Sequence, residues 1–216
     1  MKLNKFINHT LLGADSKPEH IKTLCSEAKE LKFYSVYVNG IYANLAAKEL
    51  EGSSVKVGTI VGYPFGTSST EVKIFEAKKY VNDGAHEISL IINLGMLKSG
   101  QIGYIRNEIE NIKNVTKHKL LKVVIDLNHL TCEERNILVY MCLDLGINSF
   151  EILKKNIIVE DIIEIKNLTQ MNLNINLVGN FENLFITESF INAGIKSFAT
   201  SHGVNLSKKI KNKFWS

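Results

Sequence analysis

The stretch TEVKIFEAKKYVNDGAHEISLII, residues 70–92, contains one complete helix-and-strand unit. Residues 70–82 mix apolar and charged side chains as an amphipathic helix does, and Glu71 lies in the first turn, where the helix dipole favours a negative charge. Gly84 follows at a position where helices commonly end in a left-handed residue. Residues 87–92 then form an apolar run with the length of a buried strand. The stretch therefore predicts one α/β unit.

The same alternation continues through the whole chain. The predicted strands are Lys5–Asn8, Tyr34–Val38, Val55–Val61, Glu87–Ile92, Leu120–Leu127, Ser149–Leu153, Asn174–Val178 and Ser197–Ala199. The predicted helices between them include Lys17–Leu31, Thr70–Asn82, Gly103–Thr116, Thr131–Leu145, Val159–Thr169 and Asn183–Ala193.

Strict alternation implies parallel strands joined by right-handed crossovers. Eight such units in 216 residues fit a closed (β/α)8 TIM barrel that forms one α/β domain over residues 1–216. A doubly wound open sheet is the alternative, but it would require a glycine-rich loop after the first strand. Residues 9–13 read HTLLG at that point, which favours the barrel.

The composition is that of an ordinary cytoplasmic globular protein. Hydrophobic residues make up 45% of the chain and charged residues 22%. No apolar stretch approaches the roughly 20 residues that span a bilayer, and no signal peptide is recognisable at the start. Cys25, Cys132 and Cys142 are too few and too scattered for a disulfide framework or a CxxC metal site, and we expect Cys25 and Cys142 to be buried thiols.

The net charge of +4 is concentrated at the carboxyl end, where residues 208–213 read KKIKNK. Nucleic-acid binding would require a basic stripe with stacking aromatic side chains or a known motif, and neither is present. The run is typical of a solvated terminal helix. We therefore expect neither a nucleic-acid partner nor a membrane partner.

Five segments match the motifs of one enzyme family. Residues 7–12 (INHTLL) are similar to I-D-H-T-x-L, and residues 35–39 (SVYVN) to S-V-C-V-N-P. Residues 61–73 follow V-x-G-F-P-x-G…T-T-E-x-K, residues 84–95 follow G-A-x-E-[VI]-D-x-V-I-N-[IL]-G, and residues 121–126 follow L-K-V-I-I-E. Through them the chain resembles the class I deoxyribose-phosphate aldolases. The resemblance implies a TIM barrel in which one lysine forms a Schiff base, a second lysine lowers its pKa, and an aspartate shuttles protons.

The match fails at the positions that this resemblance makes catalytic. Where the family has G-A-D-[YF]-[VI]-K-T-S-T-G, residues 146–155 read GINSFEILKK, so Glu151 takes the place of the Schiff-base lysine. Asn176 takes the place of the second lysine, Ser89 that of the fourth-strand aspartate, and Asn8 that of the first-strand aspartate. An insertion before Lys154 would restore a lysine there, but strand register argues against it.

The family's phosphate-binding segments are also altered. They correspond to Ile152–Lys155, Gly179-Asn180 and Ser201-His202, which replace most of the small residues whose backbone amides would hold a phosphate. This indicates a substrate without a phosphate group.

The remaining charged residues on the fifth and sixth strands still permit chemistry. Lys122 and Asp126 are four residues apart and therefore share one strand face with Val124. Glu151 on the next strand is a natural counterion for Lys122, because a buried charge requires a partner. Lys122 is then an oxyanion stabiliser, with Glu151 or Asp126 as a general base. The alternative is a structural ion pair.

Polar residues near strand ends are candidates for substrate binding, and so many inside a barrel must satisfy one another or hold a ligand. The candidates are Asn8, Tyr37, Asn39, Ser89, Asn93, Asn176, Ser201 and His202. His9, His129 and His202 all follow strand ends and could approach the mouth of the barrel. No HxH or HExxH spacing supports a metal site, and no metal or nucleotide cofactor is expected.

Three functional hypotheses follow. The leading one is a repurposed enzyme that acts on a small carbonyl-containing molecule by acid–base chemistry, of the lyase, isomerase, dehydratase or cyclase type. The second is a catalytically inactive barrel that binds a metabolite or a protein partner. The third is an aldolase whose Schiff base has moved to Lys122. Ordinary deoxyribose-phosphate aldolase activity is not expected, and analogy with the family suggests a homodimer.

Overall fold

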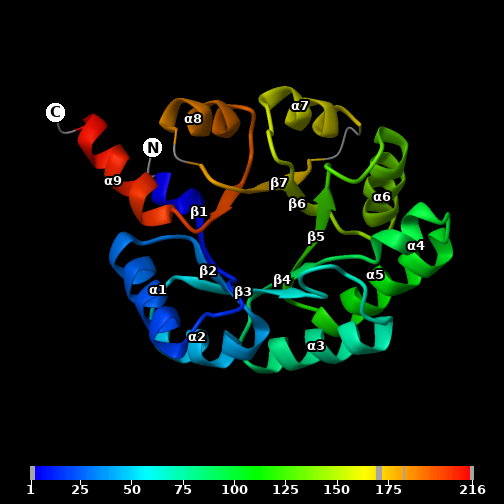
Figure 1. Ribbon diagram of the computed structural model, residues 1–216, viewed down its shortest axis with the longest axis horizontal. Coiled ribbons are helices and arrows are strands. Elements are labelled where there is room, and N and C mark those ends of the chain that lie inside the picture. The colour runs from blue at the N-terminus through cyan, green and yellow to red at the C-terminus, as the bar shows by residue number, and fades with distance from the viewer. Residues whose placement is uncertain (1–2, 169–171, 182, 215–216) are drawn as a thin grey trace.

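The computed structural model describes residues 3–168, 172–181 and 183–214, and these form a closed barrel of eight parallel strands in the order β1 to β8. Helices surround the strands as an outer ring (Figure 1). The strands are β1 (Ile7–Leu11), β2 (Ser35–Val38), β3 (Lys56–Val61), β4 (Glu87–Leu90), β5 (Leu120–Asp126), β6 (Ser149–Leu153), β7 (Asn174–Val178) and β8 (Ser197–Thr200). The predicted TIM barrel is confirmed.

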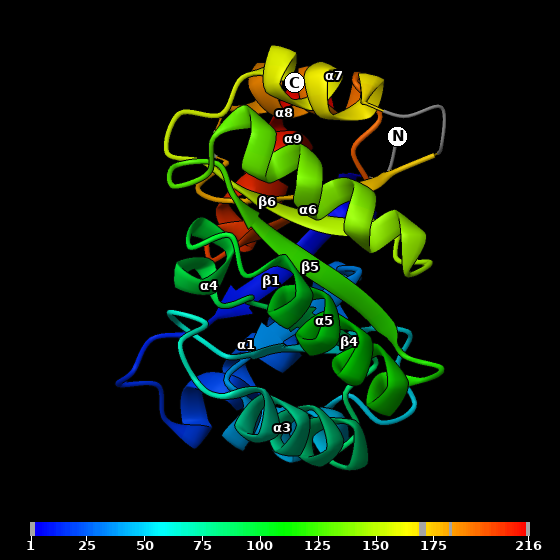
Figure 2. The ribbon, with the colours of Figure 1, turned by 90° about the vertical axis from the view of Figure 1, so that its right-hand side faces the viewer.

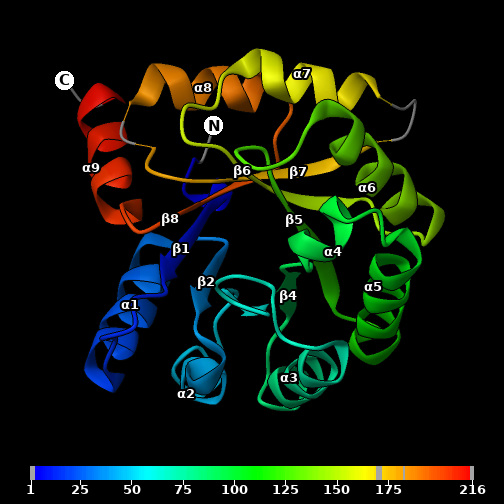
Figure 3. The ribbon, with the colours of Figure 1, turned by 45° about the vertical axis from the view of Figure 1, so that its right-hand side comes forward.

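The helices of the outer ring follow the strands in regular alternation. They are α1 (Pro18–Leu31), α2 (Ala43–Glu49), α3 (Thr70–Asn82), α4 (Leu94–Lys98), α5 (Ile102–Thr116), α6 (Cys132–Asp144), α7 (Val159–Asn167), α8 (Leu184–Asn192) and α9 (Gly203–Phe214). Two 3-10 turns, η1 (Leu3–Phe6) and η2 (Gly40–Tyr42), complete the described elements. Figure 3 shows α7 and α8 on one side of the barrel and α1, α2 and α3 on the opposite side.

Most predicted boundaries hold to within one or two residues, and β6, β7 and α3 begin and end as predicted. The first strand differs, because residues 3–6 form η1 and the strand begins at Ile7. The short helices α2 and α4 were not predicted, since seven and five residues are too few to show a helical period. The predicted end of the seventh helix, Thr169, lies outside the described residues.

The hydrophobic core lies between the barrel and its helices. Alternate residues of each strand point outward, as the two-residue period of a strand requires, and are fully buried beneath the helices. They include Ile7, Val36, Val57, Ile88, Val123, Phe150, Ile175 and Phe198. Cys25 and Cys142 are buried in this layer as expected, and burial raises the pKa of the Cys142 thiol to about 12.

A buried ion pair fixes the helices beside the mouth of the barrel. Lys73 Nζ of α3 lies 2.7 Å from Glu108 Oε1 of α5, and both side chains are completely buried. The other Glu108 oxygen accepts the backbone N–H of Asn93, at the end of β4. Burial lowers the pKa of Lys73 and raises that of Glu108, while their mutual attraction opposes both shifts. The pair therefore connects α3, α5 and the loop after β4.

A capping box fixes the loop after β5. The Thr131 hydroxyl accepts the backbone N–H of Glu134, and the Glu134 carboxylate accepts the backbone N–H of Thr131 at 2.8 Å. Helix α6 therefore starts immediately after residues 127–130, which border the site described below. Figure 2 shows β5 crossing the barrel with α4, α5 and α6 beside it.

The chain ends in α9, which packs on β1 and η1. Figure 1 shows α9 beside β1. Lys208 and Lys209 are exposed, as a solvated terminal helix predicts. None of the helices within the described residues has the length and apolar character required to cross a bilayer.

Candidate functional site in the barrel

A buried charge cluster occupies the barrel interior. Lys122 Nζ, on β5, lies 2.8 Å from Glu87 Oε2 of β4 and 3.5 Å from Glu151 Oε1 of β6. It also donates to the Tyr37 hydroxyl of β2 at 2.8 Å. All four residues are at most 2% exposed. The predicted pairing of Lys122 with Glu151 is present, but Glu87 is the nearer partner.

Tyr37 completes this cluster. Its hydroxyl donates to Glu87 Oε2 at 2.9 Å and accepts a longer bond from Ser89 at 3.4 Å. Burial and the negative charges of Glu87 and Glu151 raise its pKa well above the ordinary value, so the phenol stays protonated. The ring lies across Gly58 of β3, where a Cβ would come within 2.4 Å of ring atoms.

A second, uncharged network connects strands on the other side of the barrel interior. Asn8 of β1 donates to Ser197 Oγ of β8 at 2.8 Å and accepts from the Ser35 hydroxyl of β2 at 2.9 Å. Ser197 donates to Asn176 Oδ1 of β7 at 2.6 Å, and Asn176 donates to the Phe150 carbonyl. These four side chains therefore satisfy one another, which is one of the two alternatives that the sequence left open.

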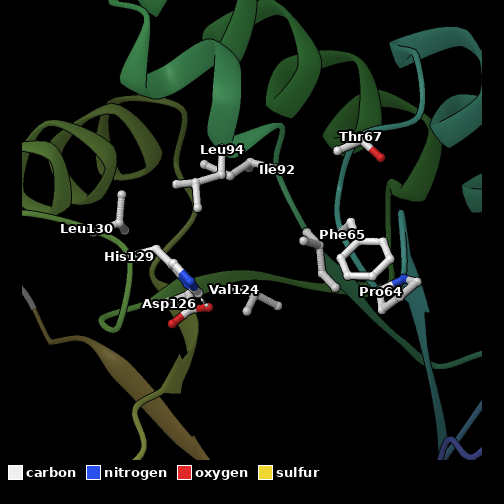
Figure 4. Close-up of a pocket in the computed structure, with 10 residues that line it drawn as sticks. Pro64, Phe65, Thr67, Ile92, Leu94, Val124, Asp126, His129 and Leu130 are labelled. Carbon is white, nitrogen blue, oxygen red and sulfur yellow. Dashed lines mark hydrogen bonds and ion pairs between the residues drawn. The ribbon is translucent and has the colours of Figure 1, made fainter.

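A pocket of about 380 Å³ opens at the carboxyl ends of β3, β4 and β5. Figure 4 shows it with Asp126 and His129 on one wall and Pro64 and Phe65 opposite them. The residues that line it are Pro64, Phe65, Thr67, Ile91, Ile92, Leu94, Val124, Asp126, His129 and Leu130. We call this the mouth pocket. Its lining is mostly apolar, and Asp126 and His129 are its titratable side chains.

Asp126 and His129 form an oriented pair. Asp126 Oδ2 lies 2.9 Å from His129 Nδ1, and Asp126 Oδ1 accepts both the backbone N–H and the side-chain amide of Asn128. A carboxylate at Nδ1 favours the tautomer in which Nδ1 carries the proton and Nε2 is a free acceptor. The pair has the arrangement of a histidine base held in place by a carboxylate.

The structure separates the three residues that were predicted to act together. Lys122 and Asp126 do face the same side of β5. Asp126 nevertheless bonds to the loop after β5 and lines the mouth pocket, whereas Lys122 and Glu151 lie deeper and do not line that pocket.

The other predicted binding residues are divided between several places. Asn39 is half-buried and donates to the Gly13 carbonyl at 3.4 Å. The Asn93 side chain caps α4 by accepting the Met96 N–H. Ser201 lies after β8, and the neighbouring His202 Nδ1 is 3.1 Å from Asn180 Oδ1. None of these four residues, Asn39, Asn93, Ser201 and His202, is among those that line the mouth pocket.

His9 lies elsewhere than expected, and Glu87 belongs to the site although it was not predicted. His9 points outward from β1, where its ring packs edge-on against Phe33 and its Nε2 lies 2.9 Å from Glu27 of α1, so it does not approach the mouth. Glu87 was not singled out. Its spacing of two from Ser89 places both on the same strand face, and this could have identified it. Within the described ranges there is no group of three metal-binding side chains.

These features define a TIM barrel of the aldolase type, and comparison with known proteins gives the family. Residues 7–135 match the model of the DeoC/LacD family aldolases, so the chain belongs to this family. It is 47% identical to a deoxyribose-phosphate aldolase of Finegoldia magna, over 62% of this chain and 63% of that protein. It is 35% identical to a deoxyribose-phosphate aldolase of Streptococcus gordonii, over 96% of both chains. The solved structure of an aldolase called QR15 superposes with a TM-score of 0.91 at 25% identity, over 99% of this chain and 97% of that one.

Proposed function

We propose that this aldolase-family barrel binds a small carbonyl compound in the mouth pocket and acts on it by acid–base chemistry, without an imine at position 151. The observation that carries the proposal is the pair in that pocket, where Asp126 and His129 are 2.9 Å apart. The lining around them is mostly apolar, which suits a small organic substrate.

The interior charge cluster supports this proposal. Glu151 points into the barrel from β6, and a carboxylate cannot form an imine with an aldehyde. Lys122 lies between the carboxylates of Glu87 and Glu151, which favour its ammonium form, and an ammonium has no lone pair with which to attack a carbonyl. Lys154 follows β6 and pairs with Asp161 at 2.6 Å, outside the strand.

The proposed reaction class is proton abstraction next to a carbonyl. His129 Nε2 accepts the proton from the carbon beside the carbonyl, and the electron pair of that C–H bond moves to give an enolate. In an α-hydroxy carbonyl compound, return of the proton to the former carbonyl carbon, with transfer of the hydroxyl proton to the former carbonyl oxygen, completes an isomerisation. In a compound with a leaving group on the β-carbon, expulsion of that group by the enolate completes an elimination. Asp126 stabilises the imidazolium that forms in between.

In this proposal the deeper cluster has a positioning role. Val124 lies between Lys122 and Asp126 on β5 and lines the mouth pocket. The bonds from Lys122 to β2, β4 and β6 hold β5 in place beneath the Asp126–His129 pair.

A second candidate is a Schiff-base aldolase that uses Lys122. It is favoured by the relatives, since proteins 35% to 47% identical to this chain are called deoxyribose-phosphate aldolases. It requires Lys122 to lose its proton and its bonds to Glu87 and Glu151 before it attacks a carbonyl. Imine trapping separates the two candidates directly.

The test is a panel of small aldehydes and ketones, including deoxyribose 5-phosphate, with two measurements. Exchange of the α-proton for deuterium, followed by NMR, reports acid–base activity. Borohydride reduction followed by peptide mass spectrometry reports an imine. We expect exchange without an adduct, and a loss of exchange of about 100-fold or more in His129→Asn.

Matched variants sharpen this test. Asp126→Asn should reduce exchange because the imidazolium loses its partner, whereas His118→Asn, at an exposed histidine outside the pocket, should leave it unchanged. A reduced adduct on Lys122 in the wild-type protein would establish the Schiff-base candidate instead. If no compound gives exchange or an adduct, the remaining hypothesis is the non-catalytic barrel.

A further inference from the structure

A second cavity, of about 310 Å³, lies at the opposite end of the barrel from the mouth pocket. Each residue that lines it precedes its strand or lies among the first three residues of it. These residues are Lys5, Tyr34, Leu120, Lys122, Ser149, Asn174, Asn176, Lys196 and Ser197. We call it the amino-end cavity. It shares no residue with the mouth pocket, so it is a separate site.

The lining of the amino-end cavity is basic. It contains three lysines and no carboxylate. Lys122 is already held by Glu87 and Glu151, which lie behind the lining. The side chains of Lys5 and Lys196 are exposed and make no ion pair with any residue that the structure describes. Two ammonium groups without counterions therefore border one cavity.

Neutral donors lie next to these lysines. Ser149 is 3% exposed and lines the cavity. Asn174 uses its side-chain amide only in a long bond of 3.3 Å to Asn148. A hydroxyl and an amide beside the lysines can form hydrogen bonds with a polar ligand in the cavity.

The surrounding end of the barrel is also positively charged. Lys56 begins β3 and Lys119 immediately precedes β5. The pKa of His86, which immediately precedes β4, is lowered chiefly by burial and then by the positive charges of Lys56 and Lys119. Glu87 at the start of β4 acts on His86 in the opposite direction, but it is paired with Lys122, so the remaining lysines attract anions to the cavity.

We propose that the amino-end cavity binds a small dianion, of the phosphate monoester class, between Lys5 and Lys196 with Ser149 as a further donor. Two ammonium groups match the charge of a phosphate dianion, and serine and asparagine groups can bond to hydroxyls of the esterified molecule. The volume of the cavity admits a molecule the size of a phosphorylated triol.

Calorimetric titration of the intact protein tests this proposal, with inorganic phosphate and glycerol 3-phosphate as the probes. We expect Lys5→Gln and Lys196→Gln each to weaken binding about threefold, and the double variant about tenfold, because each removes one exposed charge contact. Raising the salt concentration should weaken binding in the wild-type protein more than in the double variant. Ser149→Ala should weaken both probes without changing this salt dependence.

Two comparisons locate the binding. Lys78→Gln, at an exposed lysine of α3 outside the cavity, should bind both probes as the wild-type protein does. His129→Asn should also bind normally, since His129 belongs to the mouth pocket, and this keeps the result separate from the proposed reaction. Absence of phosphate binding, or binding that the Lys5→Gln/Lys196→Gln variant retains in full, would overturn the proposal. Circular dichroism of each variant establishes that it is folded.

Discussion

Lys122 Nζ and Glu87 Oε2 are 2.8 Å apart at the centre of the barrel, and neither side chain is more than 2% exposed. Glu151 lies on the other side of the same ammonium at 3.5 Å. The cluster thus has two carboxylates for one lysine, with the Tyr37 hydroxyl bonded to both Lys122 and Glu87. Lys122 offsets one of the two negative charges, and the Tyr37 hydroxyl donates a further hydrogen bond to Glu87, so each buried charge has a partner.

Removing the lysine should therefore destabilise the protein strongly. Lys122→Met leaves two buried carboxylates without a cation, and we expect a loss of about 3–5 kcal/mol in the free energy of unfolding. Urea denaturation measures this value. Lys78→Met, at an exposed lysine, should change it by less than about 0.5 kcal/mol.

A double-mutant cycle should rank the two partners of Lys122. The coupling of Lys122 with Glu87 should exceed that with Glu151, within the range of about 0.5–3 kcal/mol found for contacting pairs, because its distance is shorter. The cycles use Lys122→Met with Glu87→Gln and with Glu151→Gln. Equal couplings would mean that the ammonium lies midway between the two carboxylates in solution.

Glu151→Lys should create an imine-forming site. The new ammonium would lie beside Lys122, and repulsion between like charges lowers the pKa of at least one of the two amines. We expect borohydride trapping with a small aldehyde to give an adduct at position 151 that the wild-type protein lacks. Glu160→Lys, at an exposed position of α7, is the control. A folded variant without an adduct would show that substrates in the mouth pocket do not reach position 151.

Gly58→Ala should disturb the cluster through Tyr37. A Cβ at this position would lie 2.4 Å from the tyrosine ring, so the ring must move away from Glu87 and Lys122. We expect a loss of stability of about 1–3 kcal/mol by thermal or urea denaturation. Gly103→Ala, in α5 and with no atom within 4 Å of the new Cβ, should instead stabilise the protein by about 0.4–1 kcal/mol.

The pH dependence of stability should contain a contribution from His86. Burial, followed by the charges of Lys56 and Lys119, lowers the pKa of His86 below 6.5, and its Nδ1 accepts the Val57 N–H at 3.2 Å. The unfolded chain therefore binds this proton more tightly than the folded protein. The contribution is present above pH 6.5 and is lost as the pH falls through the folded pKa.

Melting temperatures between pH 7.5 and 5.5 measure this contribution. The wild-type protein should lose stability relative to His86→Gln as the pH falls, because glutamine does not titrate. His118→Gln, at an exposed histidine after α5, should have the same pH profile as the wild-type protein. Parallel profiles for the wild-type protein and His86→Gln would contradict the prediction.

The sequence by itself determined the barrel and which residues of a strand share one face. Helix and strand signals alternate from end to end, and the period of two along a strand places Lys122, Val124 and Asp126 on one face. These are local properties of the chain, since each depends on neighbouring residues. The same period, the adjacency of β5 and β6, and the resemblance that places this face inside the barrel together predicted the contact between Lys122 and Glu151.

Only the tertiary structure decided which groups meet. The closure of the barrel brings Tyr37 of β2 and Glu87 of β4 to Lys122. The loop after β5 places His129 next to Asp126, so Asp126 pairs with His129 and not with Lys122. It also places the mouth pocket and the amino-end cavity at opposite ends of the same strands. These relationships depend on strand stagger and loop conformation, which arise from contacts between residues distant in the sequence and leave no local pattern in it.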